Sequence, residues 1–95
     1  MPVLVTMRVK VDDFSGVKAA MAKYAQAMKR SGCHWAKVYR AEKDPKDILF
    51  LMEWESHEAF NASGDESGDD FNALIQPASE WDDVVWHLSD AVEVK

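Results

Sequence analysis

The 95-residue chain is poor in cysteine, the residue that small proteins use for disulfide bonds and reactive thiols. It holds one cysteine, Cys33, which excludes an intramolecular disulfide and any cysteine-based zinc or thioredoxin-type motif. A lone cysteine more often behaves as a small hydrophobic residue than as a reactive thiol, so we expect Cys33 to pack in a strand. Stability has to come from one hydrophobic core, and we expect residues 1–95 to form one domain.

Long hydrophobic runs are also missing. None approaches the roughly 18 residues that a membrane-spanning helix needs. The first residues carry no basic segment followed by an apolar stretch, so no secretory leader is predicted and we expect a cytoplasmic protein. Positive charge is scarce, with 11 Lys and Arg against 17 Asp and Glu. Because nucleic acids and anionic lipid surfaces are bound largely through cationic side chains, neither is an expected partner.

Hydrophobic periodicity predicts the first elements. Residues 3–11 alternate apolar with more polar side chains, which predicts a strand. Residues 14–30 carry apolar side chains at helical spacing before a Ser-Gly stop, which predicts a helix. Residues 34–41 and 48–55 are predicted to form a hairpin around the turn sequence Asp-Pro-Lys-Asp. Residues 48–52 are apolar at five successive positions, so we expect this strand to be buried on both faces.

The second half of the chain is more polar. Ser56 is predicted to cap a short helix. Residues 63–70 hold two glycines, four acids and no apolar side chain, so we expect an exposed loop there, followed by a helical turn at residues 71–75. This acidic stretch lacks the ligand pattern of a calcium loop. Alternating apolar and polar side chains predict a last strand at residues 83–94.

The resulting order, β-α-β-β-α-β, predicts an α+β ferredoxin-like fold with both helices on one face of a four-stranded antiparallel sheet. In this topology the first and third strands are central, which agrees with the apolar run in the third. Leu49 and Leu51 would then lie on the uncovered face and form an apolar patch in water. A second copy packed sheet against sheet removes this patch, so we expect a homodimer, most simply with twofold symmetry.

One segment suggests a family. The sequence Glu-Trp-Glu-Ser-His-Glu-Ala-Phe at residues 53–60 resembles the strand-to-helix junction of the antibiotic biosynthesis monooxygenase family. The resemblance implies a dimeric α+β barrel that oxidises an aromatic or quinol-like substrate with O₂ and no cofactor. Ser63 stands near the place where family members often carry a histidine. Thr6 or Met7 stands where haem-degrading relatives have an asparagine, so haem degradation is disfavoured.

Candidate site residues follow from their chemistry. Trp54 is the preferred wall of an aromatic pocket, because it stands where the sheet meets the second helix. Tyr24 and Tyr39 are candidates for a hydrogen bond to a substrate oxygen, and Asn61 is a candidate donor from the second helix. His87 is the candidate general base if its side of the strand faces the pocket, and an interface residue if it does not.

Other functional signals are weak. No two of the three histidines, His34, His57 and His87, stand at metal-ligand spacing, so no metal site is predicted. Arg8 or Arg40 is a candidate for holding an anionic group or for an ion pair between subunits. Two functions therefore stay open: a cofactor-independent monooxygenase with an aromatic pocket between helices and sheet, or a non-catalytic ligand-binding or structural dimer of the same fold. The missing helix histidine favours the second, and the aromatic content keeps the first.

Overall fold

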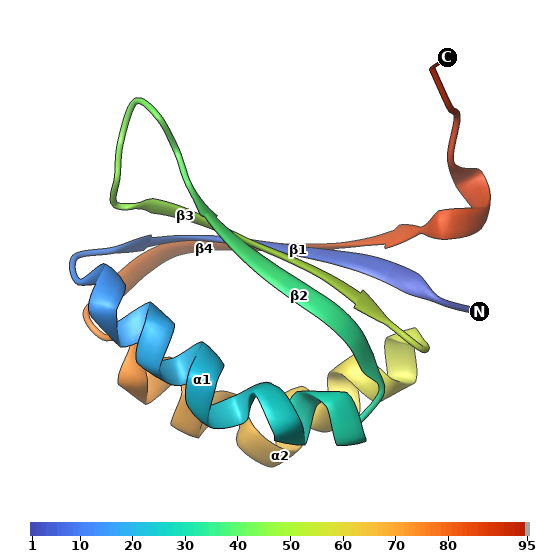
Figure 1. Ribbon diagram of the computed structural model, residues 1–95, viewed down its shortest axis with the longest axis horizontal. Helices are drawn as coiled ribbons and strands as arrows, with labels where there is room; N and C mark the ends of the chain where they lie inside the picture. Colours follow the sequence, from blue (N-terminus) through green and yellow to red (C-terminus); the bar gives the residue numbers. More distant parts are fainter. Residues whose placement is uncertain (95) are drawn as a thin grey trace.

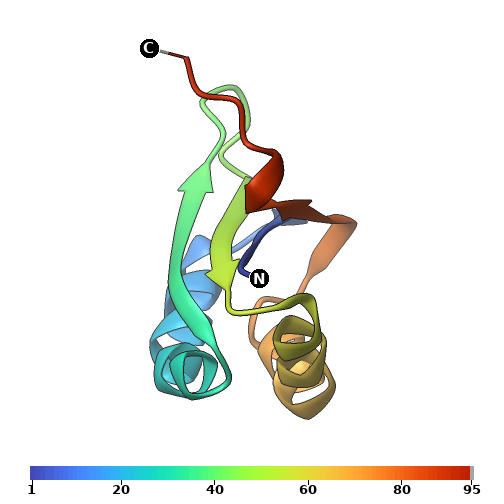
Figure 2. The same ribbon diagram turned by 90° about the vertical axis from the view of Figure 1, so that its right-hand side faces the viewer.

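A computed structural model describes residues 1–94 of the chain (Figure 1). The predicted β-α-β-β-α-β order is confirmed, as is the four-stranded antiparallel sheet. Both helices cover the same face of this sheet, so the fold has two layers and is ferredoxin-like (Figure 2). The elements are β1 (Val3–Val11), α1 (Phe14–Arg30), β2 (Cys33–Arg40), β3 (Asp47–Trp54), α2 (His57–Leu74), β4 (Ala78–His87) and the 3₁₀ turn η1 (Leu88–Asp90).

The strand order is β2-β3-β1-β4, so β1 and β3 are central as predicted. Val5 lies opposite Met52, and Val9 lies opposite Ile48. These pairs share the inner face of the sheet, against which the helices pack, because side chains directly opposite each other lie on one face. Cys33 of β2 joins this core, and burial raises the pKa of its thiol. The buried core consists of Val3, Val5, Val9, Val11, Val17, Ala20, Cys33, Ile48, Phe50, Met52, Trp54 and Ile75.

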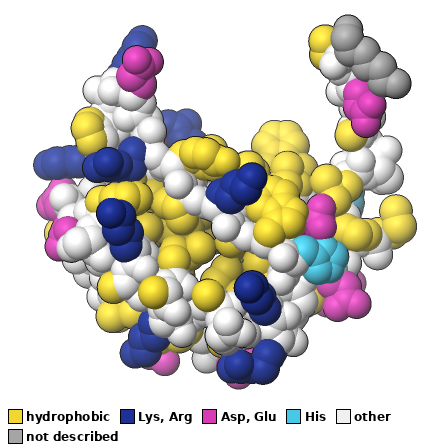
Figure 3. All heavy atoms as spheres, in the orientation of Figure 1, with side chains coloured by type: hydrophobic (Ala, Val, Ile, Leu, Met, Phe, Trp, Pro, Cys, Tyr) yellow, Lys and Arg dark blue, Asp and Glu magenta, His cyan; other side chains and the backbone are white. Residues whose placement is uncertain are grey.

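Within residues 1–94, no helix lies over the outer face of the sheet. Leu49 and Leu51 of β3 point to this face and are only half-buried, whereas the alternate residues of the strand are buried. The prediction that β3 is buried on both faces is therefore confirmed for its inner face only. Its outer face is covered by no second layer of the described chain. The β2–β3 loop and the C-terminal segment both project from the outer side of the sheet. They leave a concave surface between them (Figure 3).

Side chains and backbone geometry define the helix ends. Asp13 Oδ1 accepts a hydrogen bond from the Ser15 backbone N–H at 2.9 Å, and hydrogen bonds from Ser15 lower the pKa of this carboxyl group. Ser56 caps α2 as predicted, with its Oγ accepting from the Ala59 N–H at 3.1 Å. Gly32 follows α1 with a φ of 110°, which favours glycine, so the predicted stop is confirmed.

Helix α2 is continuous over His57–Leu74, so the predicted loop at residues 63–70 is wrong. The stretch Ser-Gly-Asp-Glu-Ser-Gly-Asp-Asp repeats small residues every four positions, close to one helical turn. Ser63 and Ser67 thereby lie on the face toward the sheet, and the Ser67 hydroxyl donates to the Ser63 carbonyl at 3.2 Å. The acids between them are exposed. The composition was that of a loop, but packing on the sheet makes the segment a helix.

The last strand was predicted at residues 83–94 and is found at Ala78–His87, so both predicted ends are wrong. The register gives the reason for the C-terminal end. His87 lies opposite Val3, the first residue of β1, so later residues have no neighbouring strand with which to pair. The valines beyond it continue the alternation in sequence but are exposed. At the other end, β4 passes an irregularity in the pairing where Glu80 has a φ of 57°.

Helices α1 and α2 approach each other closely at Gly16. A Cβ at this position would lie 2.7 Å from the carbonyl oxygen of Leu74. We expect Gly16→Ala to destabilise the fold by about 1–3 kcal/mol, because the helix backbones must separate. A Cβ at Gly64 meets nothing within 4 Å, so Gly64→Ala is the control and should gain about 0.5–1 kcal/mol from helix propensity. Urea unfolding measures both free energies, and equal values would contradict the close approach.

Candidate functional site

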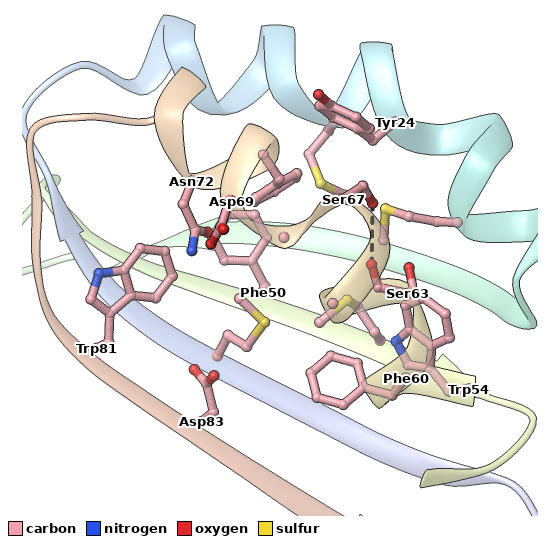
Figure 4. A pocket seen from close by; sticks show the side chains of 17 residues that line it. Tyr24, Phe50, Trp54, Phe60, Ser63, Ser67, Asp69, Asn72, Trp81 and Asp83 are labelled. Atoms are coloured by element: carbon pink, nitrogen blue, oxygen red, sulfur yellow. Dashed lines mark hydrogen bonds between the residues drawn. The ribbon is translucent and has the colours of Figure 1, made fainter. Parts of the chain in front are cut away.

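A cavity of about 400 Å³ lies between the inner face of the sheet and the two helices (Figure 4). This volume is within the range of roughly 300–1,000 Å³ for small-molecule pockets. We call this cavity the inner pocket. Every strand and helix except β2 contributes to its walls. Four methionines supply flexible, polarisable surface that adapts to a bound ring, namely Met7, Met21, Met28 and Met52.

Aromatic side chains form the rest of the apolar wall. Phe71 of α2 packs against Phe50 of β3 at a centroid distance of 5.7 Å and against Tyr24 of α1 at 6.0 Å. Trp54 packs edge-to-face on Phe60 at 5.6 Å. Such tilted and edge-to-face pairs are favourable arrangements for aromatic rings. The three contacts tie α1, α2 and β3 together around a space suited to a flat organic molecule.

The indole nitrogen of Trp54 is a buried polar atom beside the inner pocket. The residue is 2% exposed, and its indole Nε1 is buried without a hydrogen-bond partner among residues 1–94. An unpaired buried donor costs about 1–3 kcal/mol. Trp54 lines the inner pocket, and Figure 4 shows its indole nitrogen on the side of the ring toward the cavity. The N–H is therefore a buried donor beside the cavity that no group among residues 1–94 satisfies.

The small residues of α2 create the space. Ser63, Gly64, Ser67 and Gly68 all line the inner pocket, and a Cβ at either glycine would meet nothing within 4 Å. Sequence reasoning missed these residues because it interpreted them as a loop. The four-residue spacing of Ser-Gly pairs was the signal that could have identified them as one helix face.

The polar end of the inner pocket lies away from the Trp54 indole. Asp69 and Asn72 reach it from α2, and Trp81 and Asp83 reach it from β4. Figure 4 shows these four side chains grouped at one end and the Trp54 indole at the other. None of the four was predicted as a site residue. Asp69 was assigned to the loop, and Trp81 lay before the predicted strand. Asn72 and Asp83 fell within predicted elements, but sequence did not show that they face the cavity.

Asp83 has the chemistry of a proton acceptor. Asp83 lines the inner pocket but is exposed, and desolvation by its surroundings together with the neighbouring Asp82 charge raises the pKa of its carboxyl group. A carboxylate with a raised pKa binds a proton more readily than an ordinary one. A perturbed carboxyl group in the wall of a cavity is typical of a functional site. The inner pocket therefore has a hydrogen-bond donor at one end and a basic carboxylate at the other.

The predicted site residues divide into two groups. Trp54 and Tyr24 line the inner pocket, but Tyr39, Asn61 and His87 do not. Tyr39 lies on the outer face of the sheet and is 47% exposed. Asn61 is exposed on α2. The two that line the pocket come from stretches whose structure was predicted correctly, and sequence alone could not show on which side of each element the others lie.

His87 lies on the side of β4 that faces the pocket, as a base would have to, but it is located beyond the end of the pocket. It pairs with Val3, whose side chain belongs to the core, so its strand position is on the inner face. It is nevertheless the last residue of β4 and is exposed. Asp83 has the same parity four residues earlier and does line the pocket. The ionisable side chain that β4 contributes to the pocket wall is therefore that of Asp83, not His87.

The remaining charged candidates have partners within the chain. Arg8 Nη2 contacts Asp47 Oδ2 at 2.6 Å, and this hydrogen bond raises the pKa of the guanidinium group. The Arg40 guanidinium lies over the Phe14 ring, 4.5 Å from its centroid. Among the described residues, no group of three or more His, Cys, Asp or Glu side chains is placed to hold a metal ion.

No helix in the described part of the chain is long and apolar enough to span a membrane.

A comparison with protein families gives a match to the antibiotic biosynthesis monooxygenases over residues 2–73. The chain belongs to this family. The match covers most of the chain, from β1 to the end region of α2, and confirms the membership predicted from the segment at residues 53–60. Among curated proteins, none matches the chain significantly.

Solved structures show the same monooxygenase-family fold. SnoaB, a cofactor-independent oxygenase from Streptomyces nogalater, superposes with a TM-score of 0.77 and 16% identity, over 98% of this chain and 95% of SnoaB. Rv0793 from Mycobacterium tuberculosis superposes with a TM-score of 0.74 and 15% identity, over 98% of this chain and all of Rv0793 (100%). At such identities the likeness shows the shared fold alone.

Proposed function

We propose that this chain is a cofactor-independent monooxygenase that oxidises a small aromatic, quinol-like molecule in the inner pocket. The observation that carries the proposal is the buried, unpartnered indole N–H of Trp54 in an aromatic cavity of ligand size. Family membership and the likeness to a cofactor-independent oxygenase support the reaction class. The raised pKa of the Asp83 carboxyl group supplies the base that such a reaction needs.

The proposed chemistry begins with a proton transfer. Trp54 Nε1 donates to one ring oxygen of a hydroquinone, and the Asp83 carboxylate accepts the proton of the other hydroxyl group. The resulting anion is electron-rich and transfers electrons to O₂, after which a carbon–oxygen bond forms at a ring C–H position. One hydroquinone and one O₂ give one hydroxyquinone and one water. The ring supplies all four electrons, so no external reductant enters.

The walls of the inner pocket have two roles in this scheme. Aromatic and methionine side chains bury the ring faces and exclude water, which strengthens the electrostatic effect of the Trp54 donor. The small residues of α2 leave room for the ring and for O₂ beside it. The side chains therefore orient the substrate and shield the faces of its ring from solvent.

We also propose that the protein is a homodimer built on the outer face of the sheet. Leu49 and Leu51 are half-buried there, and Trp86 is 51% exposed. A contiguous apolar patch of this kind is unfavourable in water. The concave surface between the β2–β3 loop and the C-terminal segment leaves this face of the sheet open to a partner (Figure 3). The assembly closes the dimeric α+β barrel expected from the sequence.

The test is O₂ consumption with methylhydroquinone. We expect uptake above autoxidation, one O₂ per quinol and no released peroxide. Trp54→Phe keeps an aromatic wall but removes the donor, and we expect it to lower kcat/KM by roughly 10- to 100-fold, since a hydrogen bond to a charged oxygen contributes about 1.5–3 kcal/mol. Trp35→Phe, on the edge strand β2 and outside the inner pocket, is the control and should be unchanged.

The same experiment separates the alternative function. A ligand-binding dimer would bind quinols, and calorimetry would detect this, but it would consume no O₂. Absence of uptake over a series of hydroquinones, with the fold intact by circular dichroism, would overturn the oxygenase proposal. Equal rates for the wild type and the Trp54 variant would remove the indole donor from the mechanism.

A further inference from the structure

We infer that the inner pocket selects a quinol-like ring that carries a positively charged amine, and that Asp69 and the Trp81 ring bind this amine. The ring itself rests on the proposed function above. The amine rests on a separate property of the pocket, namely the sign and position of its charges.

The charged side chains of the inner pocket are all negative. Among its lining residues in the described part of the chain, Asp69 and Asp83 carry charge, and none is Lys, Arg or His. Lys23 lies over the Tyr24 ring, 5.6 Å from its centroid, but does not line the cavity. No ion pair found among residues 1–94 involves either pocket carboxylate. A carboxylated ligand would add a further negative charge, whereas an ammonium group would neutralise one.

The position of these charges matches ammonium recognition. Asp69 and Trp81 stand at the same end of the inner pocket, one on α2 and the other on β4 (Figure 4). An ammonium group binds favourably to a carboxylate and to the face of an indole ring, and the two together make a stronger site than either alone. The exposed rim around them lets a charged group keep part of its hydration.

A second feature requires a ligand that is polar at both ends. The buried Trp54 N–H lies at the far end of the inner pocket and needs an acceptor such as a ring oxygen. The apolar walls between the two ends suit a ring. When Asp83 takes up a proton from this ring, the ring becomes anionic beside the Asp69 carboxylate. An amine on the same molecule offsets that repulsion, which a neutral quinol cannot do.

The test compares three compounds that share one ring and differ in charge. They are 2-(2,5-dihydroxyphenyl)ethylamine, methylhydroquinone and 2,5-dihydroxyphenylacetate. Calorimetry at neutral pH without O₂ gives their dissociation constants. We expect the amine to bind about tenfold more tightly than the neutral compound, and the acetate to bind more weakly than either.

Matched variants locate the effect. Asp69→Asn should remove the advantage of the amine and leave the neutral compound unchanged, whereas Asp69→Glu should retain part of it. Asp65→Asn makes the same change of net charge on the same helix, at an exposed position outside the inner pocket, and should retain all of it. Equal loss in the two Asn variants would show long-range attraction by the acidic chain and would overturn the local site.

The outcomes distinguish this inference from the proposed function. Oxidation of methylhydroquinone without any preference for the amine would overturn the amine site and leave the oxygenase intact. An Asp69-dependent preference for the amine without O₂ uptake by any of the three compounds would support the amine site and overturn the oxygenase. Preferential binding of the acetate would contradict the charge argument directly.

Discussion

We expect Asp83→Asn to lower kcat for quinol oxidation by about 100- to 10,000-fold, the usual contribution of a positioned general base. The amide keeps the shape of the carboxyl group but cannot accept a proton. The dissociation constant of methylhydroquinone should change little, because the walls that hold the ring remain. Stopped-flow spectroscopy under O₂ measures the chemical step. A variant with wild-type kcat would show that Asp83 is not the base.

The pH dependence of kcat gives an independent check on the same carboxyl group. Because burial and the Asp82 charge raise the pKa of Asp83, kcat should rise with pH through a midpoint above the ordinary range of aspartate. Asp82→Asn removes one cause of the raised pKa, so its profile should move to lower pH with kcat at the plateau retained. Asp82 lies opposite Arg8 on the outer face, away from the inner pocket. An unmoved profile would contradict the coupling.

The contribution of Asp83 to the free energy of unfolding should fall as pH rises, whereas kcat should increase. A carboxyl group with a raised pKa in the folded state holds its proton longer than in the unfolded chain. Stability from this group is therefore fully present at pH values below the ordinary aspartate pKa, and it is lost as pH rises through the raised value. Asp83→Asn should consequently be at least as stable as the wild type at neutral pH. Loss of activity without loss of stability is the signature of a functional residue.

The second large effect concerns the proposed dimer. We expect the wild type to sediment at about 21 kDa, twice the 10.7 kDa of one chain, and Leu51→Asp to sediment as a monomer. Burying an unpaired carboxylate between two sheets costs several kcal/mol, which is roughly a thousandfold or more in the dissociation constant. Leu74→Asp makes the same change at a 37% exposed position on α2 and should remain dimeric. Analytical ultracentrifugation at micromolar concentration decides the matter.

Two results would contradict the outer face as the interface. One is a wild type that sediments as a monomer, and the other is a Leu51→Asp protein that remains dimeric. Circular dichroism and urea unfolding show whether the variant is folded. Should it fail to fold, Trp86→Ala tests the same face with a side chain that is half-exposed in the single chain and contributes little to the core.

The order of elements followed from the sequence, because each depends on local periodicity. The bounds of β1 and α1 agree with prediction residue by residue, since alternating valines, a cap at Asp13 and a glycine stop at Gly32 are signals carried by neighbouring residues. The central place of β3 also followed, because the β-α-β-β-α-β topology puts the first and third strands in the middle of the sheet. The segment at residues 53–60 indicated the family on its own.

The secondary structure of the more polar second half of the chain depends on contacts between residues far apart in sequence. Helix α2 contains an acidic, glycine-bearing stretch whose composition favours a loop. The sheet beneath it provides a surface on which one helix face can pack, and that surface lies far away in sequence. The end of β4 likewise depends on where β1 begins, because the strand stops at His87 once it has no partner. The end of β4 therefore cannot be read from neighbouring residues, and the only local signal for this part of α2 is the four-residue spacing of its Ser-Gly pairs.

The candidate site residues also divide into those that the sequence predicted and those that only the tertiary structure brings into the cavity wall. Trp54 and Tyr24 could be named in advance, because their elements and buried faces have strong hydrophobic periodicity. His87 was predicted as the base because the ordinary pKa of histidine lies near neutrality, and Asp83 was not among the candidates. The pairing of β4 with β1 places the carboxylate in the cavity wall and the imidazole beyond it. Sequence by itself therefore determined the fold and the family, through interactions between near neighbours. The tertiary structure decided which polar groups share the cavity, because that depends on the register between distant strands and on the packing of α2 over them.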